Sequence, residues 1–160
     1  MTLDGTASRS QSRVGAVGGT APVLVVGLDG SPTSWDAFSW AAGEATRSNG
    51  RLVAVYVTPA VEPVATFGES SGYAAVEQAR DEVAEHLKEE ATQRAHHLGV
   101  DLRFVWERGD AAVAINRIAQ SVGADLIVVG RSAKVLHHLG GSLGRRLLSR
   151  HDAPVIVVVP

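Results

Sequence analysis

Short runs of apolar residues alternate along this chain with longer stretches in which apolar residues recur at helical spacing. The clearest runs cover residues 23–28, 52–57, 124–129 and 155–159. Short runs that are almost entirely apolar are typical of strands buried on both faces of a parallel sheet. Residues 100–106 instead alternate apolar and polar side chains, which predicts a half-exposed third strand near a sheet edge.

Amphipathic helices are predicted between these strands. The first follows Ser31-Pro32, because serine is a good N-cap and proline is tolerated at the first helical position. It ends at Asn49-Gly50, a good C-terminal signal. Gly109-Asp110 is expected to cap the third helix, and residues 142–150 form the fourth.

The second helix is predicted to be the longest, and it follows a long loop. Residues 58–72 contain two prolines and lack periodicity, which indicates the loop, and Gly99 ends the helix. Its predicted buried stripe consists of Val76, Ala79, Val83, Leu87, Ala91, Ala95 and Leu98. Alternating strands and helices predict a single α/β domain, a three-layer α/β/α sandwich around a parallel sheet with right-handed connections.

Two residues stand at the carboxyl ends of predicted strands, which is where parallel sheets bind ligands. Asp29 comes directly after the first strand, and Gly130 directly after the fourth. Open parallel sheets bind ligands at the carboxyl ends of their strands, near the point where the strand order reverses. The stretch from Val128 to Leu143 also has the order strand, glycine turn, helix start, which presents backbone N–H groups to an anion.

Composition narrows the class of protein further. A chain of 160 residues that is 45% apolar can bury one core, and a net charge of -2 argues against nucleic-acid binding. The absence of cysteine excludes disulfides, thiolate catalysis and cysteine-ligated metals. No apolar run is long enough to cross a bilayer. We expect a cytoplasmic protein with a disordered tail over residues 1–20 and one domain over residues 21–160.

Several motifs, taken in order, resemble the universal stress protein family, whose type member is called UspA. They are Val25–Ser31 with Trp40-Ala41, Gly109-Asp110, Gly123–Gly130, Gly141-Ser142 with Arg145-Arg146-Leu147, and Ala153–Val158. The resemblance covers residues 22–160 and implies a Rossmann-like sheet of order 3-2-1-4-5, as in adenine-nucleotide α-hydrolase-like folds. It also implies a homodimer through the last strand, residues 155–159, which would cover an aggregation-prone edge.

The resemblance implies a site for ATP or a related adenine nucleotide. It sets Asp29 beside the adenine or ribose, Val57 against the base, and Gly130 near the ribose and phosphates. Gly141, Ser142 and Leu143 would offer N–H groups and a hydroxyl to the phosphates. The expected cofactor-binding residues are therefore Asp29, Val57, Gly130, Arg131, Ala133, Gly141, Ser142 and Leu143.

The expected phosphate loop departs from the family pattern in two ways. Nucleotide-binding members carry Gly-x-x-Gly, nine residues, then Gly-Ser or Gly-Thr, whereas this chain has Ala133 at the second glycine and only seven residues, 134–140, before Gly141. Alanine disfavours positive φ and close approach of the backbone to a phosphate. Basic side chains could compensate or could simply be solvated: Arg131, Lys134, His137, His138, Arg145 and Arg146.

Three classes of function stay open. The first is a regulatory dimer that binds an adenine nucleotide, and the second is a stress-related interaction module with a degenerate phosphate loop. The third, an enzyme such as a nucleotidyl transferase, would need acids beyond Asp29, and the loop offers only Glu62 and Glu69. We expect no catalytic residue and no metal site, since His137-His138 has no carboxylate or thiol in its loop; slow ATP hydrolysis stays open.

Overall fold

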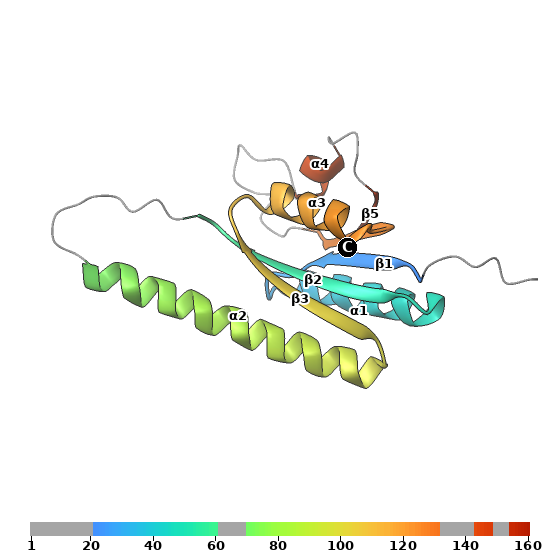
Figure 1. Cartoon of the computed structure of the whole chain (residues 1–160), viewed down its shortest axis with the longest axis horizontal. Coiled ribbons are helices and arrows are strands. Elements are labelled where there is room, and N and C mark those ends of the chain that lie inside the picture. Colours follow the sequence, from blue (N-terminus) through green and yellow to red (C-terminus); the bar gives the residue numbers. More distant parts are fainter. Residues whose placement is uncertain (1–20, 61–69, 132–142, 149–153) are drawn as a thin grey trace, which may run out of the picture.

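A five-stranded parallel sheet forms the centre of the molecule (Figure 1). The computed structural model describes residues 21–60, 70–131, 143–148 and 154–160. The strands are β1 (Val23–Gly27), β2 (Arg51–Thr58), β3 (Asp101–Arg108), β4 (Leu126–Gly130) and β5 (Val155–Val159). Their order is β3-β2-β1-β4-β5, and every neighbouring pair is parallel. The predicted fold is therefore confirmed, including the position of the alternating third strand at an edge.

Helices cover both faces of this sheet. Helices α1 (Pro32–Ser48) and α2 (Ser70–Leu98) lie on one face, and α3 (Ala111–Val122) and α4 (Leu143–Leu148) on the other (Figure 1). Alternate residues of β1 enter two separate apolar clusters: Leu24 packs with Phe38 of α1, and Val25 packs with Ile115 of α3. This alternation explains why the central strand is apolar throughout.

The predicted caps determine where the helices begin and end. Ser31 is the N-cap of α1, and its Oγ accepts a hydrogen bond from the Ser34 amide at 3.2 Å. Asp110 caps α3 in the same way, accepting from the Val113 amide at 3.0 Å. Asn49 closes α1 in the left-handed conformation, with φ 52°. These short polar contacts satisfy backbone groups that a helix end would otherwise leave unpaired.

Some boundaries differ from the predicted ones. Strand β2 runs through Thr58 and α2 begins at Ser70, so the predicted loop is shorter than residues 58–72. Strand β4 begins at Leu126, because the Ala124 amide still bonds the Ala119 carbonyl at the end of α3. Helix α4 is described over Leu143–Leu148, and the other residues of the predicted helix 142–150 lie outside the described residues. The predicted disordered tail, residues 1–20, lies outside the described residues.

The predicted buried stripe of α2 is wrong over the first half of that helix. Its buried residues are Ala84, Leu87, Ala91 and Ala95. Val76 and Val83 are 49% and 48% exposed, and Ala79 and Leu98 are exposed as well. The first turns of α2 extend past the ends of the strands in Figure 1, so they cover little of the sheet, and Val83 faces a surface groove. An apolar strip is therefore left at the surface.

Candidate functional site

A hydrogen-bonded turn holds Asp29 at the carboxyl end of β1. The Asp29 carboxylate accepts a hydrogen bond from the Ser31 amide at 3.0 Å, and the Asp29 amide donates to Ser34 Oγ at 3.3 Å. The buried Ser34 hydroxyl in turn donates to the Ser31 carbonyl at 2.9 Å. Gly30 supplies the positive φ of 82° that this turn needs. Asp29 is thus exposed on a backbone that is closely tied to the start of α1.

Gly130 ends β4 in direct contact with the first turn of α1. A Cβ atom at this position would collide with the Thr33 carbonyl group and lie 2.9 Å from the Ser34 backbone nitrogen. The missing side chain is therefore required by packing between β4 and α1, whatever ligand the site binds. Ser34 was not singled out in the sequence, although a serine that follows an N-cap by three residues can indicate such a turn.

Asp29 and Gly130 lie on the two strands between which the sheet changes winding direction. Strands β1 and β4 are neighbours, with Val26 in register with Val128. Helix α1 leaves β1 on one face, whereas α3 reaches β4 on the other (Figure 1). The two residues therefore flank the reversal point at the carboxyl edge, which is where sheets of this kind bind ligands.

The other described candidates lie around this edge but differ in orientation. Val57 is half-buried in the apolar cluster on the α3 face, and Leu143 packs in the same cluster. Leu143 Cδ2 lies 4.0 Å from where a Cβ on Gly27 would be, so the start of α4 adjoins the end of β1. Arg131 is exposed, and its amide donates to the Val159 carbonyl at 2.7 Å.

The remaining phosphate-loop candidates cannot be located. Ala133, Gly141 and Ser142 lie outside the described residues, and so do the loop bases Lys134, His137 and His138. Their assignment to the site rests on the sequence alone. Within the part of the chain that the structure describes, no group of three His, Asp or Glu side chains could hold a metal ion. No described helix is long and apolar enough to cross a membrane.

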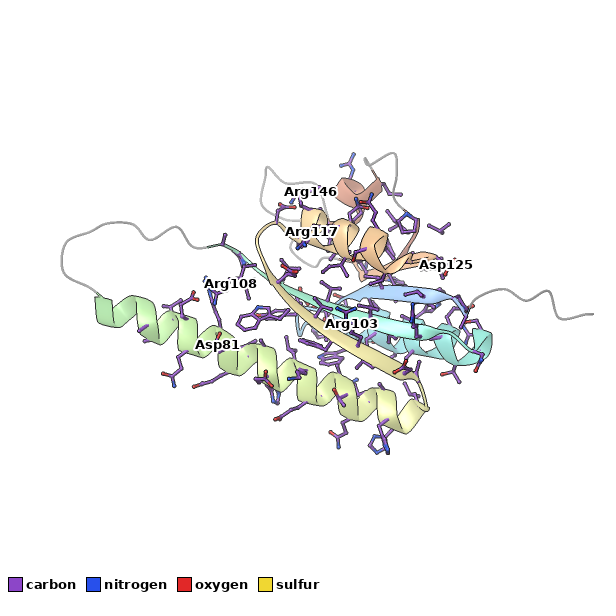
Figure 2. All side chains as sticks on the ribbon, viewed as in Figure 1. Asp81, Arg103, Arg108, Arg117, Asp125 and Arg146 are labelled. Atoms are coloured by element: carbon purple, nitrogen blue, oxygen red, sulfur yellow. The ribbon has the colours of Figure 1, made fainter. Side chains whose placement is uncertain are left out.

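Arg146 makes an ion pair that ties α4 to α3. Its guanidinium bonds the carboxylate of Asp110, the N-cap of α3, at 2.5 Å (Figure 2). The hydrogen bond from Arg146, followed by that from the Val113 amide, holds the pKa of Asp110 below its ordinary value. The sequence suggested Arg146 as a phosphate partner or a solvated residue, and the structure adds a carboxylate partner for a side chain that is 48% exposed.

Tyr56 is a polar group near the candidate site that sequence reasoning missed. Burial raises the pKa of its hydroxyl, which the nearby Arg80 opposes and the Asp29 carboxylate reinforces. The phenol therefore stays protonated at neutral pH. The sequence signal for this residue is a tyrosine within an apolar strand. It stands next to Val57 and therefore points to the opposite face of the sheet.

Glu77 holds Arg80 over this part of the sheet. Its carboxylate bonds Arg80 at 3.1 Å and Arg108 of β3 at 2.6 Å, and it is largely shielded from solvent. The Arg108 guanidinium also lies 5.6 Å from the ring centroid of Trp106. One carboxylate thus links the first half of α2 to the carboxyl end of β3.

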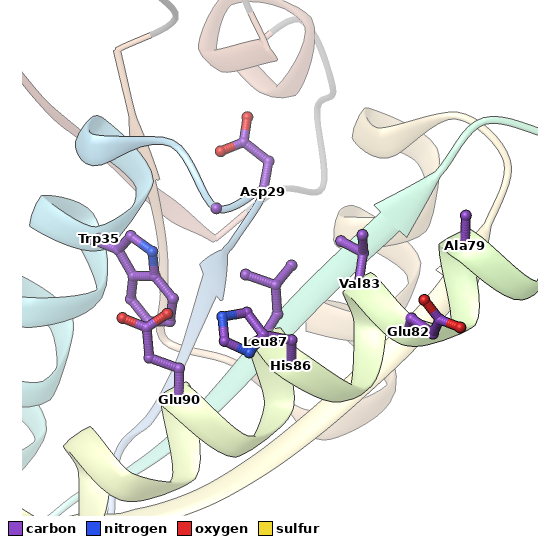
Figure 3. Close-up of a pocket in the computed structure, with 9 residues that line it drawn as sticks. Asp29, Trp35, Ala79, Glu82, Val83, His86, Leu87 and Glu90 are labelled. Carbon is purple, nitrogen blue, oxygen red and sulfur yellow. The ribbon is translucent and has the colours of Figure 1, made fainter.

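A groove of about 530 Å³ opens between the Asp29 turn and α2 (Figure 3). Trp35 of α1 closes one end, and Val83, His86 and Leu87 of α2 form the opposite wall. The Asp29 carboxylate points away from the α2 side chains in Figure 3. Asp29 therefore separates two regions, the reversal point between β1 and β4 and the groove between α1 and α2.

Fold and site together define a doubly wound α/β protein with a polar turn at the carboxyl edge of its sheet. The model of the universal stress protein family matches residues 22–159. Because this match covers most of the chain, the protein belongs to the universal stress protein family. No curated protein sequence matches it.

Solved structures of universal stress proteins are similar to this chain. One from Burkholderia pseudomallei is 28% identical with a TM-score of 0.68, covering 86% of this chain and 95% of that one. A universal stress protein described as in complex with cAMP is 25% identical with a TM-score of 0.67, covering 87% and 97%. UspA from Lactobacillus plantarum is 21% identical with a TM-score of 0.69, and the match covers 89% of this chain and 99% of that one. At this identity the similarity shows the fold alone.

Proposed function

We propose that this protein is a stress-response regulator that binds an adenine nucleotide at the carboxyl edge of its sheet. The proposed ligand is ATP or a relative, and the proposed role is regulatory with no catalytic residue. The proposed site comprises Asp29, Val57, Gly130, Arg131, Ala133, Gly141, Ser142 and Leu143.

One observation carries this proposal: Asp29 and Gly130 flank the reversal point between β1 and β4. A solved universal stress protein that is 25% identical is described as in complex with cAMP, which supports an adenine ligand. The Asp29 turn, fixed by Ser31 and Ser34, is a rigid polar surface of the kind that orients a ribose or base. Preorganised groups reduce the entropy lost when a ligand binds.

Isothermal titration of nucleotide-stripped protein with ATP, ADP, AMP and cAMP tests the proposal. We expect a dissociation constant on the order of 1 μM, or about -8 kcal/mol, for at least one of them. Adenosine and GTP are the controls for the phosphates and for the base. Absence of heat with every adenine nucleotide, in protein shown to be folded, would reject nucleotide binding.

A second candidate is an interaction module that does not bind nucleotide. Gly130 favours it, because packing against Thr33 alone accounts for a glycine there. Ala133 in place of a glycine, together with the shortened loop, points the same way. The same titration separates the two candidates.

We also propose that two copies pair through β5. This strand lies at the edge of the sheet, and its Val155 and Val158 are 66% and 46% exposed. An apolar edge strand presents unpaired backbone groups that another strand can bond. Pairing β5 with its counterpart would cover both the backbone and these side chains.

A further inference from the structure

The groove between α1 and α2 combines an apolar wall with acidic side chains. Ala79 and Val83 supply apolar surface above the buried Leu87, and Trp35 supplies an aromatic end wall (Figure 3). Glu82 and Glu90 of α2 also line the groove. An apolar surface between two helices with charged residues at its margin matches the way proteins bind amphipathic helices.

The charge of α2 favours a cationic occupant. Within Ser70–Leu98 there are six carboxylates and three Lys or Arg residues. Of these carboxylates, Glu82 and Glu90 line the groove. Glu90 is paired with Arg94, whereas Glu82 accepts a hydrogen bond from the neutral amide of Gln78, at 3.0 Å. A basic ligand would therefore meet complementary charge at Glu82, and an acidic one would be repelled there.

Arg94 already shows how a cation fits at one end of the groove. Its guanidinium lies 4.2 Å from the ring centroid of Trp35 and 2.6 Å from the Glu90 carboxylate. Trp35 is also fixed by an edge-to-face contact with Phe38, with centroids 5.6 Å apart. Aromatic and carboxylate groups at this end thus accommodate one basic side chain of the protein itself.

The apolar strip of α2 continues beyond the groove. Val76 and Val83 are seven residues apart on the same side of the helix, and both are about half exposed. From Val76 to Glu90 the helix spans roughly 21 Å at 1.5 Å per residue. A small cation would leave most of this strip in water, whereas an extended partner would cover it.

We infer that this groove docks a basic amphipathic helix of a partner protein. The apolar face of that helix packs on Ala79 and Val83, and its Lys or Arg side chains face Glu82. This inference is independent of nucleotide binding, because none of these three residues belongs to the proposed nucleotide site. It applies equally to a nucleotide-bound protein and to one that binds none.

Fluorescence anisotropy with a labelled model peptide tests the inference. The probe is an amphipathic helix of about 18 residues, with leucine on one face and lysine on the margins. Its matched control has glutamate in place of lysine. The full-length protein is titrated as wild type and as the Glu82→Lys, Val83→Ser and Asp81→Lys variants, with folding checked by circular dichroism.

The pair Glu82→Lys and Asp81→Lys separates groove binding from general attraction. Both change the net charge equally at exposed neighbouring residues, but Asp81, labelled in Figure 2, is not among the residues that line the groove. We expect Glu82→Lys to weaken binding of the lysine peptide by about tenfold and Asp81→Lys by less than about twofold. Val83→Ser is expected to weaken it by about threefold at low and high salt alike, since an apolar contact is not screened.

Four binding results would overturn the inference. They are equal losses in the two charge variants, equal affinity for the glutamate peptide, absence of binding by the lysine peptide, and displacement of the lysine peptide by spermine, added as a small polycation without an apolar face. Sedimentation of the variants completes the experiment. A change in self-association on Val83→Ser would assign the strip to a second copy of this chain and also reject the inference.

Discussion

Gly130 at the end of β4 and Thr33 in the first turn of α1 are in backbone contact, with no room for a side chain between them. This contact brings β4 and the Asp29 turn together at the carboxyl edge of the sheet. A glycine that matches a nucleotide-binding motif can thus be required for a purely structural reason. Ligand binding and fold stability must therefore be measured separately at this residue.

We expect Gly130→Ala to destabilise the protein by about 1–3 kcal/mol, because the new methyl group overlaps the Thr33 carbonyl and the backbone must shift. Urea unfolding followed by circular dichroism measures this loss. Gly43→Ala is the matched control: its Cβ would meet only the flexible end of Arg47, at 3.3 Å, within α1. That variant should gain about 0.5–1 kcal/mol, and an equal loss in both would refute the packing explanation.

Asp110 is expected to act both as an N-cap and as the partner of Arg146. Asp110→Ala should cost about 1–2 kcal/mol, since the Val113 amide loses its acceptor and Arg146 loses its partner. Asp110→Asn keeps a capping oxygen and loses the ion pair, so it should cost no more than about 1 kcal/mol. The two free energies of unfolding, measured at neutral pH, separate the roles; a larger loss in Asp110→Asn would contradict this division.

The same carboxylate makes stability depend on pH. Its pKa in the folded protein lies below the ordinary value of 3.8, so the unfolded chain binds more protons between the two values. The contribution of Asp110 is therefore present above pH 3.8 and is lost as the pH falls through the folded pKa. Unfolding curves of wild type and Asp110→Asn should converge over that acidic range, and a constant difference would contradict the assignment.

Ala133→Gly is expected to raise the affinity for ATP by about tenfold, equivalent to about 1.4 kcal/mol, if the phosphate loop functions. Glycine restores positive φ and lets the backbone approach a phosphate closely. Calorimetric titration of the variant beside the wild type measures the change. Unchanged binding would count against a phosphate loop at this position.

Gly141→Val is expected to have the opposite effect and abolish nucleotide binding. A branched side chain there would block the backbone N–H groups that precede α4. The variant is compared with wild type by titration after circular dichroism has shown an intact fold. Retained affinity would mean that the nucleotide binds elsewhere.

Val158→Lys is expected to dissociate the proposed β5 dimer by placing charge at its interface. Val113→Lys on α3 is the control, because these valines have similar exposure, 46% and 44%, and only Val158 belongs to β5. Sedimentation velocity over a range of concentrations gives the oligomeric state. Equal dissociation by both variants, or none by Val158→Lys, would exclude pairing through this strand.

Residues with a local role could be predicted well from the sequence. Ser31 and Asp110 cap helices because their side chains bond amides three residues later, and that spacing is visible in the chain itself. The exposed Val76 and Val83 could not be predicted, because helical spacing does not reveal where the covering sheet ends. Contact between Gly130 and Thr33, far apart in sequence, likewise depends on the three-dimensional arrangement.

The candidate site likewise contains some residues that the sequence predicts and some that it does not. The position of Asp29 followed from its place after an apolar strand, and Gly130 from the motif at the end of another. The pairing of Arg146 with Asp110 depends on α3 and α4 being neighbours, which charge alone does not indicate. Arg80 influences the pKa of Tyr56 because α2 passes near β2, and neither segment indicates this relation by itself.

The central position of β1 has a consequence for biosynthesis. The Val23 amide donates to the Asp125 carboxylate at 2.9 Å across 102 residues, and β1 pairs with both β2 and β4. A chain emerging from the ribosome therefore makes β1 before β4 and leaves the second edge of β1 uncovered until β4 has followed. An apolar strand edge is exposed over that interval, in which chaperones can protect it from aggregation.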